Sequence, residues 1–223
     1  MVCLLYLNLV KICHKRNTAI TNHAYHTGRT IRYDLTFLLT RQAFERLAAL
    51  AGKDGLPSSM DLFGHAGTHL DLMGKDYPED YFQRPGRLFD VRGVIGRDIE
   101  PADFALDTAQ PGDFVLFHSG CLAAHEYGTK DYVFALIQLS WPTIHALLER
   151  KINLLGIDFA GVRLPAEHAQ ADRLCADAGT FVVENLYGLA DLAAAGSPSF
   201  TVHTYPMRLE GATGLPCRVV AEV

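Results

Sequence analysis

The stretch SWPTIHALLERKINLLGIDFAG, residues 140–161, places a helix directly before a β-strand. Ser140 is a favoured residue at the start of a helix, proline two positions later suits the first turn, and apolar residues then recur at helical spacing. The run NLLGIDFAG (153–161) is short, apolar and closed by glycine, which is typical of a buried strand. A helix that leads into a strand indicates a partly parallel sheet, so this stretch favours an α/β fold.

Elements on either side of this stretch fit the same fold class. Thr40 can cap a helix that Gly52 ends, and residues 166–178 favour a helix that Gly179 ends. Strands are predicted at IRYDLTFLL (31–39), LFDVRGVIG (88–96), GDFVLFHSG (112–120), TFVVENL (180–186), FTVHTYPMRL (200–209) and PCRVVAEV (216–223). Strands outnumber long helices and the two alternate only in the second half, so α/β or α+β is possible. We expect α/β, with a mixed sheet and flanking helices.

The domain organisation follows from where this pattern begins. A single domain is expected over residues 29–223, because a chain of 223 residues is large enough for one well-buried core. Residues 1–28 are expected to form an arm that is disordered or lies upstream of the native start. The short apolar run at the N-terminus has its charges after it and no small-residue cleavage site, so an export signal is not predicted.

The composition excludes several classes of partner. Apolar residues make up 49% and charged residues 20%, and no stretch of about 18 apolar residues is present to span a bilayer. The formal net charge of −5 is spread along the chain without a basic run, which argues against nucleic acid and membranes. The five cysteines are scattered and form no Cys-x-x-Cys pair, as expected of buried thiols in a reducing, cytoplasmic compartment.

The stretch GHAGTHLDLMGKDYPEDYF, residues 64–82, carries the most chemical information. If it is extended, alternate side chains share a face, so His65, His69 and Asp71 converge over Gly67, which leaves room for an ion. If it is helical, the two histidines still share a face. Two imidazoles and a carboxylate suit zinc, manganese or iron. The pattern predicts a divalent metal site, whereas two histidines four apart on their own more often form a hydrogen-bonded surface pair.

HAGTHLD (65–71) resembles the H-x-G-T-H-x-D motif of the cyclase family, which includes bacterial kynurenine formamidases and isatin-hydrolase-like enzymes. YDLT (33–36), GDFVLFHSG, LLGIDFAG, FVVENL and GLPCRVVAEV look like further blocks of that family in its order, so the resemblance covers residues 31–223. It implies a compact α/β fold, homo-oligomers (dimers or tetramers), and zinc or manganese on His65, His69 and Asp71. It also implies hydrolysis of an amide or formamide in a small molecule, such as N-formylkynurenine to kynurenine and formate in tryptophan catabolism, or of a cyclic amide.

The resemblance also implies two further metal ligands, a histidine and a glutamate about a dozen residues apart. Glu184 in the ENL block matches the glutamate, and Asp172 stands where formamidases have the histidine. An aspartate there favours a harder ion such as manganese or weakens a second site, so one or two ions are expected. On the predicted 166–178 helix, His168 lies one turn before Asp172, which makes it either a rival ligand or a solvated residue.

The chain departs from the family at the proposed proton carrier. In the family, the motif continues to a histidine that is the proposed acid/base. In this chain, Lys75 occupies the position of that histidine. Lys75 beside a dication can move protons, can hold a substrate carboxylate, or can be a solvated lysine near Asp76. His118 or His203 could replace the lost histidine, but each alternates within an apolar strand, which is more typical of a core residue. We predict a metal-dependent amide hydrolase with Lys75 as the candidate catalytic residue. The alternative is a non-catalytic metal- or ligand-binding relative that has lost the catalytic histidine.

Overall fold

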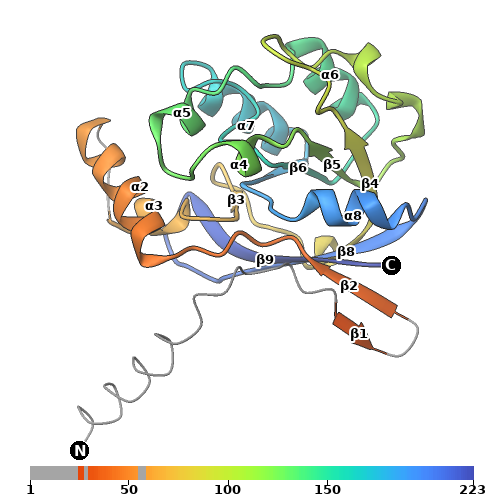
Figure 1. The fold of residues 1–223 in the computed structure, drawn as a ribbon, viewed down its shortest axis with the longest axis horizontal. Coiled ribbons are helices and arrows are strands. Elements are labelled where there is room, and N and C mark those ends of the chain that lie inside the picture. Colours follow the sequence, from red (N-terminus) through yellow and green to blue (C-terminus); the bar gives the residue numbers. More distant parts are fainter. Residues whose placement is uncertain (1–24, 28–29, 55–58) are drawn as a thin grey trace, which may run out of the picture.

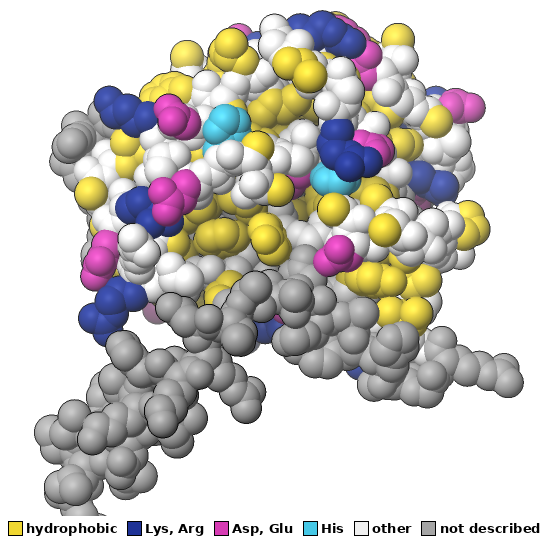
Figure 2. All heavy atoms as spheres, in the orientation of Figure 1, with side chains coloured by type: hydrophobic (Ala, Val, Ile, Leu, Met, Phe, Trp, Pro, Cys, Tyr) yellow, Lys and Arg dark blue, Asp and Glu magenta, His cyan; other side chains and the backbone are white. Residues whose placement is uncertain are grey.

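The computed structural model of the protein describes residues 25–27, 30–54 and 59–223. The predicted arm at residues 1–28 lies outside the described residues, except that Tyr25–Thr27 form a strand paired with Thr30–Arg32. No helix in the described ranges is long and apolar enough to cross a membrane. On the face drawn in Figure 2, Lys and Arg side chains lie beside Asp and Glu side chains and do not gather into one basic patch.

The elements alternate between strands and helices through the second half of the chain, as Figure 1 shows. The strands are β1 (Tyr25–Thr27), β2 (Thr30–Asp34), β3 (His69–Asp71), β4 (Gln83–Asp90), β5 (Phe114–His118), β6 (Leu154–Ile157), β7 (Phe181–Glu184), β8 (Phe200–Pro206) and β9 (Gly214–Glu222). The α-helices are α2 (Arg41–Asp54), α3 (Ser59–Gly64), α4 (Cys121–Ala124), α5 (Lys130–Val133), α6 (Trp141–Glu149), α7 (His168–Asp177) and α8 (Leu189–Ala195). Three short 3₁₀ helices are η1 (Glu79–Tyr81), η2 (Pro101–Asp103) and η3 (Leu106–Thr108).

The strands form one mixed sheet in the order β1-β2-β9-β3-β7-β6-β5-β4-β8. Strands β4, β5, β6 and β7 are parallel to one another, while β3, β8 and β9 pair with their neighbours antiparallel. Because β8 also pairs with β9, the described strands from β9 round to β8 close into a barrel-like ring, and β1 and β2 extend it on one side. The predicted α/β fold with a mixed sheet and flanking helices is confirmed.

Strands β5, β6 and β7 are mainly apolar, and every residue in them is buried, as expected where both faces of a sheet are covered. In β5, Val115 and Phe117 pack into a core beneath the helices, whereas Phe114 and Leu116 point into the ring. Helices α6 and α7 lead into β6 and β7 and lie over the outer face (Figure 1). The described cysteines, Cys121, Cys175 and Cys217, are buried free thiols, as expected.

Several boundaries differ from the predicted ones. The first predicted strand ends at Asp34, and α2 continues through Gly52 to Asp54. β4 begins at Gln83 and ends at Asp90 because β8 and β5 supply its partners there, a long-range choice that local pattern does not reveal. Gly179, with φ of 82°, follows the end of α7 as predicted.

Candidate metal centre

β3 aims two of the predicted ligands at one face of the sheet. Leu70, the middle residue of β3, is fully buried in the core inside the ring. Side chains alternate along a strand, so His69 and Asp71 point to the opposite face. In register with β3, Glu184 of β7 lies opposite His69. Glu184 follows Val183, another residue of the ring core, so it points outward as well.

His65 reaches the same place by a different route from the predicted one. Helix α3 ends at Gly64 and β3 begins only at His69, so residues 65–68 form a turn and not an extended strand. Gly67 has φ of 72°, a left-handed conformation that glycine adopts at little cost. A Cβ at Gly67 would meet Leu39 and Phe37, not the histidines. The interpretation that Gly67 vacates the space for an ion is therefore wrong; it allows the turn.

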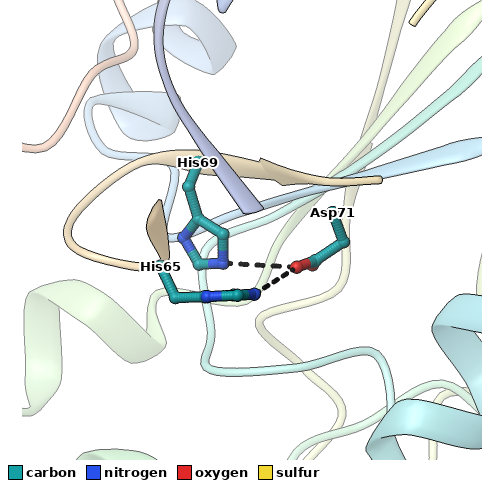
Figure 3. A group of neighbouring side chains, drawn as sticks. All are labelled: His65, His69 and Asp71. Carbon is teal, nitrogen blue, oxygen red and sulfur yellow. Dashed lines mark ion pairs between the residues drawn. The ribbon is translucent and has the colours of Figure 1, made fainter. Parts of the chain in front are cut away.

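The two imidazoles converge on one carboxylate oxygen, as Figure 3 shows. The Nε2 atoms of His65 and His69 lie 3.2 and 3.7 Å from Asp71 Oδ1. The ligand atoms of the three residues all lie within 4.8 Å of one another. Atoms that bind one ion tetrahedrally at about 2.1 Å are roughly 3.4 Å apart, so this spacing suits a shared ion.

Backbone carbonyls fix the orientation of both rings. His65 Nδ1 lies 2.8 Å from Asp61 O, and His69 Nδ1 lies 2.9 Å from Gly67 O. Each Nδ1–H donates to its carbonyl, because a carbonyl oxygen can only accept. The remaining Nε2 then carries the lone pair that a metal ion requires.

A second group of potential ligands overlaps the first at Asp71. It consists of Asp71, His168, Asp172 and Glu184, whose ligand atoms also lie within 4.8 Å of one another. His168 Nε2 lies 2.8 Å from Glu184 Oε1 and 3.0 Å from Asp172 Oδ2. Glu184 Oε2 lies 3.5 Å from His69 Nε2, which joins the two groups. The structure thus brings all five predicted metal ligands together and adds His168.

In the described residues, the carboxylates of this cluster form ion pairs with histidines and with no lysine or arginine. Asp71, Asp172 and Glu184 are each 3% exposed. In the described part of the chain, Asp71 Oδ2 and Asp172 Oδ1 have no hydrogen-bond partner. Buried carboxylates are costly unless they are paired or hold a metal, so these two oxygens match the requirement of a cation site.

The carboxylates also raise the pKa values of His65 and His168 in the cluster. Burial opposes a charged imidazole, but the hydrogen bond and charge of Asp71 outweigh it and raise the pKa of His65 to about 9. At His168 burial is likewise outweighed, by Glu184 and Asp172, and the pKa rises to about 12. Burial, reinforced by the charge of Asp71, raises the pKa of Asp172 to about 7. Without an ion the cluster therefore holds protons that a divalent cation would replace.

The cluster forms the floor of a cavity of about 440 Å³. His65, His69, His168 and Glu184 line its polar end. The remaining lining residues are mainly apolar or aromatic: Leu47, Leu50, Ala51, Tyr127, Gly128, Tyr132, Val133, Phe134, Ala160, Pro165 and Asn185. A cavity lined mainly by apolar side chains, with a few polar groups at one end, is typical of a small-molecule site.

Sequence reasoning missed the residues that support the ligand turn. Asn185, in a left-handed conformation with φ of 57°, donates from Nδ2 to Gly67 O at 3.0 Å. Tyr132 Oη donates to Asn185 Oδ1 at 2.5 Å, and the Gly67 N–H donates to Tyr127 Oη at 2.8 Å. Asn185 directly follows Glu184 in the ENL block and could have been noticed there. Tyr127 lies in the loop before α5 and Tyr132 within α5, both far from the motif in the sequence, and neither carries a local signal.

The structure does not bring Lys75 to the cluster. Its Nζ lies 2.7 Å from Asp177 Oδ1, at the end of α7, and both side chains are about half-exposed. Lys75 lines a separate cavity of about 370 Å³, away from the three histidines. Of the three interpretations of Lys75, a solvated surface lysine agrees best with this position, although its partner is Asp177 and not Asp76.

Neither His118 nor His203 joins the cluster. His118 is buried, as expected of a core residue, and lines a different cavity of about 700 Å³. His203 is only partly buried, with its Nε2 3.9 Å from Glu222 Oε2.

Comparisons with known proteins identify the family of this chain. The family model "Putative cyclase" matches residues 17–162. The chain belongs to the cyclase family. A search of curated proteins gave no match.

Solved structures share the cyclase-family fold. One is a potential metal-dependent hydrolase with cyclase activity, 22% identical, with a TM-score of 0.64 over 86% of this chain and 98% of that chain. Another, from Bacillus stearothermophilus, is described as a predicted metal-dependent hydrolase; it is 22% identical, with a TM-score of 0.65 over 87% and 99%. Isatin hydrolase A from Labrenzia aggregata, bound to benzyl benzoate, is 20% identical, with a TM-score of 0.65 over 87% and 94%. At these identities the likeness establishes the fold.

Proposed function

We propose that this protein is a metal-dependent hydrolase that cleaves an amide or formamide bond in a small molecule. The observation that carries the proposal is the buried cluster of three histidines and three carboxylates at the floor of an apolar cavity. Two carboxylate oxygens, Asp71 Oδ2 and Asp172 Oδ1, have no hydrogen-bond partner among the described residues. Together with the oriented Nε2 atoms of His65 and His69, they are suited to bind a divalent ion. The hydrolase names of the structurally similar cyclase-family proteins support the reaction class.

The proposed ligands are His65, His69 and Asp71, with Glu184 and Asp172 beside them. When bound, zinc or manganese supplies Lewis-acid polarisation of a carbonyl and makes water more acidic, as amide hydrolysis requires. The carbonyls of Asp61 and Gly67 hold the two histidine rings so that their Nε2 atoms stay directed at Asp71.

His168 is the residue of this chain best placed to move a proton. Its Nε2 lies between Glu184 Oε1 and Asp172 Oδ2, and its side chain is 30% exposed where it lines the cavity. A proton on Nε2 links the two carboxylates and can pass to the leaving nitrogen of the substrate. A second ion would take the place of that proton, so we expect one or two ions per chain.

The cavity wall favours an uncharged, ring-containing substrate. Val133, Phe134, Leu47 and Leu50 offer apolar surface above the cluster and exclude water from it. No lysine or arginine lines the cavity in the part of the chain that the structure describes. A cyclic amide such as isatin therefore suits the wall better than N-formylkynurenine, whose free carboxylate would lack a cationic partner.

The test is metal analysis of the purified protein followed by assays with isatin and N-formylkynurenine. We expect bound zinc or manganese, and turnover that a chelator abolishes and the metal restores. Bound metal without turnover of either substrate would favour the non-catalytic relative. Protein that takes up no metal would contradict the proposal.

We also propose a cytoplasmic homo-oligomer, dimer or tetramer, from the family resemblance. The exposed apolar side chains Phe134 and Leu136, 53% and 70% exposed, support self-association near the cavity mouth. Light scattering coupled to size-exclusion chromatography measures the oligomeric state directly.

A further inference from the structure

We propose that Tyr127 is a catalytic residue that donates a hydrogen bond to the carbonyl oxygen of the bound substrate, the oxygen that gains negative charge during hydrolysis. The inference rests on the proposed hydrolase function. It assigns a task to a buried hydroxyl that neither the ligand motif nor the family blocks single out.

The position of the hydroxyl is fixed by its surroundings. Tyr127 lies in the loop between α4 and α5, is 5% exposed, and packs its ring against Phe37 with centroids 4.6 Å apart. Its Oη accepts the N–H of Gly67 at 2.8 Å, and Gly67 sits between His65 and His69 in the chain. Tyr127 also lines the cavity whose floor the histidines form. The hydroxyl is therefore held beside the ligand turn, on a residue that lines the cavity.

The proton of this hydroxyl is available. Among the described residues, Tyr127 Oη has no acceptor, because its one hydrogen bond is received from Gly67. Several other donors near the cluster have protein acceptors: His65 and His69 donate from Nδ1 to backbone carbonyls, Tyr132 donates to Asn185, and His168 Nε2 lies between Glu184 and Asp172. Burial raises the pKa of Tyr127 to about 12, although the Gly67 hydrogen bond opposes this, so the hydroxyl keeps its proton at neutral pH.

The chemistry needs a donor at this place. When the oxygen of water adds to the carbonyl carbon, a C–O bond forms and the π electrons of the C=O bond move onto its oxygen. Collapse then re-forms the C=O bond and breaks the C–N bond; the nitrogen takes a proton from His168 as it leaves, and the proton that the added water gives up replaces it. A preorganised O–H next to the developing oxyanion stabilises the transition state more than the neutral substrate. The proton of Tyr127 is shared in a hydrogen bond and is not transferred.

The first test compares Tyr127→Phe with Tyr187→Phe. Tyr187 packs against the same Phe37, with centroids 6.2 Å apart, but lines a different cavity, so it is a matched control for loss of a hydroxyl. Rates are normalised to bound metal, because Tyr127→Phe also removes the acceptor of the Gly67 N–H. We expect kcat of Tyr127→Phe to fall by about 10²-fold with little change in KM, as for loss of one oxyanion donor. Tyr187→Phe should keep the wild-type rate.

The second test does not depend on turnover. Phenylphosphonate presents tetrahedral anionic oxygens on an aryl group, and calorimetry gives its dissociation constant for the metal-loaded proteins. We expect binding to Tyr127→Phe to be about tenfold weaker than to wild type or Tyr187→Phe, the effect of one hydrogen bond to a charged group. Equal affinity for all three proteins would overturn the role of Tyr127.

The outcomes separate this inference from the proposed function. Wild-type protein without metal-dependent turnover would contradict the hydrolase proposal, whereas turnover that Tyr127→Phe retains per bound metal would contradict only the role of Tyr127. If Tyr127→Phe does not fold, 3,5-difluorotyrosine at position 127 keeps the hydroxyl and its Gly67 contact but ionises more readily. We then expect the rate of the difluorotyrosine protein to fall at a lower alkaline pH than the wild-type rate, because the ionised hydroxyl cannot donate a hydrogen bond. An unchanged pH profile would overturn the proposal.

Discussion

Asp71 is the residue on which both groups of potential ligands depend. Its Oδ1 faces the two oriented imidazoles, while its Oδ2 has no hydrogen-bond partner among the described residues. Both oxygens of a carboxylate can face a cation. An amide at this position would present only one oxygen and would bring N–H groups toward the cation.

Asp71→Asn should therefore weaken zinc or manganese binding by at least about 100-fold while the fold is kept. Asp76→Asn is the matched control, because Asp76 is an exposed carboxylate five residues further along. Dissociation constants from competition with a chromophoric chelator check this. Equal metal affinity of Asp71→Asn and wild type would remove Asp71 from the site.

Substitution of Lys75 should leave metal binding and turnover intact. The pairing of Lys75 with Asp177 at the surface is of a kind that contributes little to stability, and Lys75 does not line the cavity of the metal ligands. Lys75→Met should keep metal content and keep turnover within about twofold of wild type. Steady-state assays on the metal-loaded variant measure this. Abolished turnover with metal intact would restore Lys75 as the proton carrier.

The residues of the site were predictable to the extent that they share a short motif. His65, His69 and Asp71 lie within seven residues, so their convergence could be predicted although the backbone between them is a turn. The position of Lys75 depends on where the end of α7 lies, and His168 depends on the packing of α7 against β7. Such distances are set by tertiary structure, which local spacing does not contain.

At the level of elements, β9 holds the ligand turn in place from its other side. Gly214 at the start of β9 pairs with Asp71 of β3, and a Cβ at Gly214 would lie 2.8 Å from the His65 ring. The absence of a side chain there lets the ring lie flat against the strand. His65 is thus oriented by the carbonyl of Asp61 on one side and by β9 on the other.

Gly214→Ala should push the His65 ring away from Asp71 and reduce metal affinity by about tenfold or more, with the sheet retained. Gly93→Ala serves as the control, because a Cβ at Gly93 meets nothing within 4 Å. Calorimetric titration with zinc, together with circular dichroism of both variants, measures the effect. Unchanged affinity in Gly214→Ala would show that His65 is not constrained by β9.

The elements themselves were largely predictable, and their pairing was not. The helix and strand at residues 140–161 appear as α6 and β6 because capping and apolar spacing are local properties. The closure of the ring depends on β9, which pairs with β2, β3 and β8 along different parts of its length. Nothing in the sequence of β9 alone specifies that it pairs with these three strands.

For the whole molecule, the cluster places carboxylates in a buried position that folding alone does not favour. His65 has a folded pKa of about 9 against an ordinary value of 6.5, and the pKa of Asp172 is raised from 3.8 to about 7. A raised folded pKa gives stability that is complete below the unfolded pKa and is lost as the pH rises through the folded value. Both groups act in this direction, Asp172 between pH 3.8 and about 7 and His65 between pH 6.5 and about 9, and His168, whose pKa is raised to about 12, adds to the loss above pH 6.5.

The metal-free protein should therefore lose stability as the pH rises from 6.5 to 9, by about 1–3 kcal/mol. The stabilisation by added zinc should grow over the same range, since deprotonated histidines bind metal more tightly. Urea unfolding with a chelator and with zinc, at several pH values, measures both trends. A metal-free protein whose stability rises with pH would contradict the assignment of charge in the cluster.

The central claim is that His65, His69 and Asp71, with Glu184 beside them, hold a divalent ion at the floor of the cavity. Elemental analysis by plasma mass spectrometry, after reconstitution with zinc or manganese and removal of loosely bound ions by dialysis, tests it most directly. We predict about one to two equivalents of metal per chain, falling to background in the triple variant H65A/H69A/D71A. Wild-type protein that retains no more metal than this variant would contradict the account.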